Sequence, residues 1–129
     1  MAYGLFDIRM PYTVSAQIAA ADTTVPKNLV AWTATPILIT DILLTNSDTA
    51  DHIVALTYYT GTNSRRLGSV NVPARAGYDG AAPVSFFANG APPNFGAWAL
   101  VNAYSLQISV TVTMPAVVVV DAMAFGGYL

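Results

Sequence analysis

Apolar and polar residues alternate most regularly between Tyr104 and Met114. One side of this segment carries Leu106, Ile108, Val110, Val112 and Met114, and the other carries Gln107, Ser109, Thr111 and Thr113. A period of two over this length predicts a β-strand with one face against a core. The polar face holds hydroxyls and an amide but no Lys or Glu, so we expect it to contact water or a partner protein.

Two further segments have the apolar content of strands and are separated by a short polar stretch. Ile37–Asn46 is apolar on both faces except at Asp41, so we expect both faces to be covered. His52–Thr60 is the second segment, and the residues between them, NSDTAD, have the composition of a turn. The order strand, turn, strand predicts that the two segments pair as an antiparallel hairpin.

Stretches rich in Pro, Gly and Asn divide the rest of the chain into short runs. The remaining strands are predicted at Thr13–Ala20, Asn28–Thr33, Arg65–Val72, Val84–Phe87, Ala97–Val101 and Val117–Phe125. Such regular spacing is typical of sandwiches and barrels, so we predict an all-β fold of about eight or nine strands. The expected architecture is an antiparallel β-sandwich, jelly-roll or Greek-key in topology, over residues 13–129, with residues 1–12 as an N-terminal arm or edge strand.

The composition agrees with an all-β chain and indicates assembly. All seven acidic residues are Asp, and Lys27 is the one lysine, so Glu and Lys, two strong helix formers, are nearly absent. Only 9% of the residues are charged, against about 25% in typical soluble domains. Because so few charges cover the surface, we expect neighbouring protein subunits to cover much of it.

Residues that could catalyse a reaction are few. The chain has no Cys and one His, His52, which excludes a thiolate metal site and argues against zinc. A Ser-His-Asp set would have to combine His52 with Asp51 and with Ser47 or Ser64, and no nucleophile-elbow sequence is present. We therefore predict no catalytic residue and do not expect an enzyme.

The turn after Ile37–Asn46 is the one place where oxygen ligands cluster. Asn46, Asp48 and Asp51 have the oxygen atoms that calcium prefers, but the sequence lacks an EF-hand pattern. Asx-rich turns usually bind their own backbone instead. We predict a structural turn here, with no metal and no cofactor.

Three arginines, Arg65, Arg66 and Arg75, are close in sequence to tyrosines. Arg and aromatic residues are found together in nucleic-acid grooves and at protein interfaces. Five cations and a net charge of -2 give no basic footprint, so we expect a protein interface and no nucleic-acid partner. No apolar run approaches the length of a transmembrane helix, so we expect no membrane partner.

The chain resembles small all-β auxiliary virion proteins of tailed bacteriophages in three runs. These are ITDILLTNSDTADHIVALTYYTGT, the strand end VNVPA, and YSLQISVTVTMPAVVVVDAMAFGGY, which is similar to their closing hairpin. The resemblance implies a capsid decoration (cement) protein on the capsid surface, assembled in the host cytoplasm. Its implied partner is the major capsid protein or another virion structural protein, and a homo-oligomer, with a trimer favoured, is expected.

Large side chains in terminal and loop segments are candidate contacts with such partners. They are Tyr3, Leu5, Phe6, Ile8, Arg9, Tyr12, Phe95, Tyr128 and Leu129. The alternative is a glycan- or receptor-binding module of a phage tail, baseplate or head fibre, which would use exposed aromatics such as Trp32 and Trp98. A self-assembling coat that packages nucleic acid is a third hypothesis, and the net charge argues against it.

Overall fold

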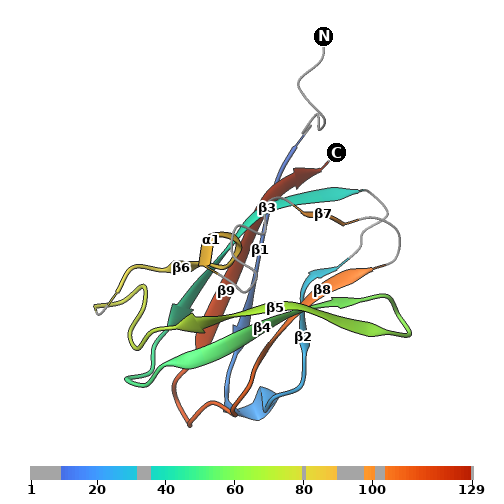
Figure 1. Ribbon diagram of the computed structural model, residues 1–129. Helices are drawn as coiled ribbons and strands as arrows, with labels where there is room; N and C mark the ends of the chain where they lie inside the picture. The colour runs from blue at the N-terminus through green and yellow to red at the C-terminus, as the bar shows by residue number, and fades with distance from the viewer. Residues whose placement is uncertain (1–9, 32–35, 80, 90–97, 101–103, 129) are drawn as a thin grey trace.

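The computed structural model describes residues 10–31, 36–79, 81–89, 98–100 and 104–128, which form two antiparallel β-sheets (Figure 1). Sheet A contains β1 (Met10–Ile18), β9 (Val120–Tyr128), β3 (Ile37–Asn46), β6 (Val84–Ser85) and β7 (Trp98–Leu100). Sheet B contains β2 (Lys27–Ala31), β8 (Ser105–Val110), β4 (His52–Tyr59) and β5 (Ser64–Val72). The all-β sandwich predicted from the sequence is confirmed.

The strand order is that of a jelly roll. Sheet A follows the order β1-β9-β3-β6, with β7 also paired to β3, and sheet B follows β2-β8-β4-β5. Most connections pass from one sheet to the other, and β4–β5 is a hairpin within sheet B. This alternation places segments that are distant in sequence side by side, as in other jelly rolls.

An apolar core lies between the sheets. In β3 the core side chains are Ile37, Ile39, Ile42 and Leu44, each with 0% exposure. The inward positions change from odd to even numbers because a bulge shifts the register between Ile39 and Asp41. Burial of each such side chain contributes about 1.5–3 kcal/mol relative to exposure, so β3 is a main source of stability.

The predicted hairpin between Ile37–Asn46 and the following strand is wrong. β3 pairs with β9 in sheet A, whereas β4 pairs with β5 and β8 in sheet B. The side chain of Asn46 is buried and donates to the carbonyl oxygens of Ala50, Val72 and Pro73, which directs the connection across the core. The predicted closing hairpin is also absent, because β8 and β9 lie in different sheets.

The alternation that begins at Tyr104 is confirmed as far as Val110. Leu106, Ile108 and Val110 are buried, while Gln107 and Ser109 are only partly buried. Beyond Val110 the strand ends, and the chain bends. Val112 is 68% exposed and Met114 is 2% exposed, so the second half of the predicted strand is wrong.

Other strand boundaries also differ from the prediction. β6 ends at Ser85, and a single helical turn, α1 (Phe86–Asn89), replaces the rest of the predicted strand. This turn buries both Phe86 and Phe87, which a strand with alternating faces would not do. β9 begins at Val120 instead of Val117, which is fully exposed.

The N-terminal edge of the sandwich is formed by β1. It begins at Met10, so residues 10–12 belong to an edge strand, and residues 1–9 lie outside the described part of the chain. The described residues contain two short helices, η1 (Ala20–Asp22) and α1. Neither has the length and apolar character needed to cross a membrane.

Candidate functional site

One face of sheet A is turned away from the core and presents three strands side by side, β1, β9 and β3 (Figure 1). The register places Ser15 opposite Met123 and Met123 opposite Leu43, so these side chains form one row. The rows on either side consist of Gln17, Asp121 and Thr45, and of Thr13, Phe125 and Asp41. We call this surface the outer face of sheet A.

A hollow of about 390 Å³ opens on the outer face of sheet A. It is lined by Ser15, Leu43, Thr45, Pro83, Asp121, Ala122 and Met123. Most of this lining is apolar, and Met123 is 41% exposed. A concave apolar surface with a few polar atoms at its edge is typical of binding sites.

The loop between β5 and β6 supplies one wall of the hollow through Pro83. Its backbone is fixed to β3, because the backbone N–H of Asn46 donates to the carbonyl oxygen of Ala76 at 2.9 Å. Gly77 has a φ of +81°, and a Cβ at this position would lie 2.4 Å from Cγ2 of Thr45. Only glycine fits this close approach, so the wall has a defined position.

Both carboxylates on the outer face of sheet A are engaged in hydrogen bonds. The Asp121 carboxylate accepts from Nε2 of Gln17 at 3.0 Å. The Asp41 carboxylate accepts from Oγ of Ser85 and from the backbone amide of Ile42, each at 2.7 Å. No described cation forms an ion pair with either carboxylate, so the described part of this face carries two negative charges among hydroxyl, amide and apolar groups.

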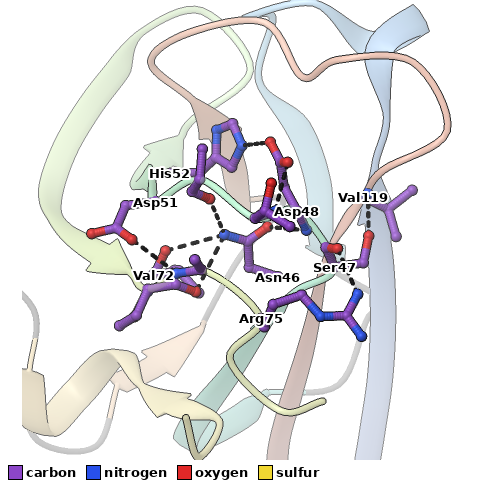
Figure 2. A network of polar contacts seen from close by, with 12 residues as sticks. Asn46, Ser47, Asp48, Asp51, His52, Val72, Arg75 and Val119 are labelled. Atoms are coloured by element: carbon purple, nitrogen blue, oxygen red, sulfur yellow. Dashed lines mark hydrogen bonds and ion pairs between the residues drawn. The ribbon is translucent and has the colours of Figure 1, made fainter. Parts of the chain in front are cut away.

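A second group of polar residues lies where β3 passes into β4, at one end of the sandwich (Figure 2). Asn46 is at its centre: Nδ2 donates to the carbonyl of Ala50 at 2.8 Å, and Oδ1 accepts from the amide of Asp48 at 2.9 Å. Oγ of Ser47 accepts from the amide of Val119 at 2.8 Å. The network therefore connects the crossing between the sheets to the start of β9.

His52 takes part in this network through Asp48. Its Nε2 lies 2.7 Å from Oδ2 of Asp48, and both side chains are nearly buried. This hydrogen bond is the main reason that the pKa of Asp48 is lowered. Figure 2 shows that Asp51 points away from His52, toward the end of β5. The described residues do not assemble a Ser-His-Asp set at His52.

The two serines of that hypothetical triad are also misplaced. Ser47 bonds to Val119 and not to His52. Ser64 pairs with Tyr59, whereas His52 pairs with Val72 at the opposite end of the β4–β5 hairpin. The described geometry offers no activated hydroxyl at His52.

The carboxylate of Asp51 is committed to the backbone and to a neighbouring strand. It accepts from the amide of Ala74 at 2.8 Å and from Nδ2 of Asn71 at 3.1 Å. The hydrogen bond from Ala74 is the largest cause of its lowered pKa. Asn46, Asp48 and Asp51 thus bond to the backbone and neighbouring side chains of a loop that crosses between the sheets, where the sequence predicted a hairpin turn. No group of three His, Cys, Asp or Glu side chains suited to a metal is found among the described residues.

The three arginines are not brought together. Arg75 donates to Asp79 at 2.8 Å and to the carbonyl of Ser47 at 2.9 Å, and its guanidinium lies 4.9 Å from the centre of the Tyr78 ring. Arg65 and Arg66 lie at the other end of β5, exposed, and no described carboxylate forms an ion pair with them. A continuous basic groove is therefore not formed by these three residues.

Of the predicted contact residues, Tyr12 and Tyr128 lie in the described part of the chain. Their rings pack edge to face, with centroids 5.3 Å apart and an interplanar angle of 86°, and both are half-buried against the core. Burial is the main reason that the pKa of Tyr12 is raised. Outside the described residues lie Tyr3, Leu5, Phe6, Ile8, Arg9, Phe95 and Leu129, and also Trp32.

Sequence reasoning missed the outer face of sheet A. Met123 and Leu43 lie in runs that are apolar on both faces, so the pattern gave no sign of which face is open. The signal that could have been used is Asp121, a charged residue within such a run, because a charge marks the solvent side of a strand. Met123, two residues further along β9, shares that side.

No protein-family model and no curated protein matches this chain. A functional hypothesis therefore depends on the chemistry of the surfaces described above.

Proposed function

We propose that this protein is a structural protein of a virus particle, a capsid decoration protein that binds the coat lattice through the outer face of sheet A. The observation that carries the proposal is the hollow of about 390 Å³, with a mostly apolar lining, on a face whose described charged residues are Asp41 and Asp121. An apolar hollow bordered by two hydroxyls and by the Asp121 carboxylate fits a protruding apolar or basic side chain of a protein partner.

The low charge of the chain supports the same proposal. The surface area is 6721 Å², and a standard interface covers about 800 Å² of each partner. A decoration protein on a lattice contacts several coat subunits, so about three such interfaces would cover roughly a third of this surface. Many weak contacts on a lattice also reinforce one another through effective concentration.

The test uses particles made without the gene for this chain. Purified protein is added to them, and the bound amount is measured by co-sedimentation and quantitative mass spectrometry. Wild-type protein should bind to saturation at a fixed number of copies per particle. Met123→Lys fills the apolar hollow with a long charged side chain and should weaken binding by about tenfold or more, because its ammonium group, even beside Asp121, would lose its water at the interface.

The matched control is Ile53→Lys, which changes another exposed apolar strand residue, 45% exposed, in sheet B. This variant should bind like wild type. Equal binding of Met123→Lys and wild type would remove the outer face of sheet A from the proposal, and no binding of wild-type protein to particles would reject the function. Binding of wild-type protein to a glycan array, with none to particles, would support the tail or fibre alternative instead.

A further inference from the structure

β1 is an edge strand: among the described residues it pairs with β9 alone, and no described strand pairs with its other edge. Its nine residues, MPYTVSAQI, contain no charged side chain. Soluble proteins normally protect a long edge strand with charges, prolines or bulges. β1 pairs with β9 without a register shift, and Pro11 is its one protective residue.

Three hydrogen bonds determine which backbone groups of β1 face this open edge. Nζ of Lys27 donates to the carbonyl of Gln17 at 2.7 Å, so this carbonyl points away from β9. On the other side of β9, the carbonyls of Val119 and Phe125 accept from Ser47 and Thr40, which are residues of β3 and its continuation. Because backbone groups alternate along a strand, odd-numbered residues of β9 bond to β3 and even-numbered residues bond to β1.

It follows that Pro11, Thr13, Ser15 and Gln17 direct their backbone groups outward. Thr13 and Ser15 each offer one amide N–H and one carbonyl. Pro11 offers only a carbonyl, because proline has no N–H. Gln17 offers its N–H, since its carbonyl is already bonded to Lys27.

This arrangement is complementary to itself in one register. When two copies of β1 pair antiparallel, the two-fold axis can pass through Thr13, Val14 or Ser15, because in each case odd-numbered residues of one copy lie opposite odd-numbered residues of the other. Only the pairing around Val14 places Pro11 opposite Gln17. Pro11 has no N–H to donate, and the Gln17 carbonyl needs no further donor because it already accepts from Lys27. Thr13 and Ser15 then exchange both of their hydrogen bonds with the partner. The pairing around Thr13 leaves a carbonyl of Ser15 without a donor, and the pairing around Ser15 uses the occupied carbonyl of Gln17.

We propose that two copies of this protein pair along β1, antiparallel and centred on Val14, to form a continuous sheet across a two-fold axis. The inward side chains of Tyr12, Val14 and Ala16 are partly exposed at the rim of the core and would be covered by the partner. No charges of like sign meet within the paired residues of β1. The pairing rests on the edge geometry and not on the proposed function.

A cysteine scan tests both the pairing and its register, because the chain has no natural Cys. Across a pair that does not exchange hydrogen bonds the Cα atoms are about 4.5 Å apart, within the range of a disulfide. Val14→Cys should therefore form a disulfide-linked dimer under mild oxidation. Ala16→Cys is the control, because its two copies would be displaced by about four residues, or roughly 14 Å, along the strands.

The expected result is that Val14→Cys cross-links at least about tenfold faster than Ala16→Cys. Faster cross-linking of Thr13→Cys or Ser15→Cys than of Val14→Cys would reject the register. Equal rates for all positions would reject the pairing altogether.

Light scattering after size-exclusion chromatography provides a second test without oxidation. Wild-type protein should have twice the mass of the 13.6 kDa chain. Ser15→Pro removes an N–H that points away from β9, so the hydrogen bonds between β1 and β9 remain and the protein should become a monomer. Ser15→Ala keeps the N–H and should remain a dimer.

A monomeric wild type, or a dimer or trimer unaffected by Ser15→Pro, would overturn the pairing. Particle binding is measured independently of these results. A monomer that binds particles would reject the pairing and retain the proposed function, and a dimer that does not bind them would do the reverse.

Discussion

The buried side chain of Asn46 allows the sharpest prediction about stability. It is 0% exposed and forms contacts in two directions (Figure 2). Nδ2 donates to the carbonyls of Ala50 at 2.8 Å and of Val72 and Pro73 at 3.3 Å, and Oδ1 accepts from the amide of Asp48 at 2.9 Å. These bonds join the crossing between the sheets to the end of β5.

Asn46→Ala removes all of these contacts. The buried amide of Asp48 and the partly buried carbonyl of Ala50 lose their bonds to Asn46, whereas Val72 stays paired with His52 and the carbonyl of Pro73 keeps the amide of Ala76. At about 1–1.5 kcal/mol for each of the two groups, the free energy of unfolding should fall by about 2 kcal/mol. With a urea m-value of about 2 kcal/mol/M, the midpoint should fall by about 1 M.

Urea unfolding followed by tryptophan fluorescence measures this change. The control is Asn63→Ala at the exposed turn between β4 and β5, where the free energy of unfolding should change by less than about 0.5 kcal/mol. If Asn46→Ala is also within about 0.5 kcal/mol of wild type, the reasoning that this amide directs the crossing is refuted.

Two further predictions concern close packing and pH. Gly126→Ala would place a Cβ 1.8 Å from the carbonyl oxygen of Leu38, so soluble folded protein should be lost on expression. The control, Gly61→Ala, meets nothing within 4 Å and should fold with only modest strain at its φ of +94°. Folded yield and circular dichroism measure both variants, and a normally folded Gly126→Ala would contradict the packing of β9 on β3. The hydrogen bond from His52 lowers the pKa of Asp48, so this carboxylate stabilises the fold above its unfolded pKa of about 4, and the contribution is lost as the pH falls through the lower folded-state pKa. Urea midpoints measured from about pH 6 to about pH 2 should therefore decrease less in Asp48→Asn than in wild type, and parallel curves would show that the pair does not contribute.

The strands and the all-β class could be predicted from the sequence because they depend on local periodicity. Alternation at Leu106, Ile108 and Val110 identified β8, and the runs 37–46 and 52–60 identified β3 and β4. The prediction at residues 84–87 failed where tertiary packing prevailed, since α1 buries two consecutive phenylalanines. The bonds of Asn46, Asp48 and Asp51 to nearby backbone follow a local tendency of Asn and Asp, but the segment crosses between the sheets and is not the predicted hairpin turn.

The sequence by itself determined that this chain forms strands, that it carries few charges, and that its Asx-rich turn serves the backbone. The tertiary structure alone decided which strands pair, because β3 could satisfy its hydrogen bonds with β4 as well as with β9, and periodicity is the same in both cases. That choice of partner creates the outer face of sheet A, its hollow and the open edge of β1. These features join residues from opposite ends of the chain, such as Ser15 and Met123, and such distant contacts leave no trace in a local pattern.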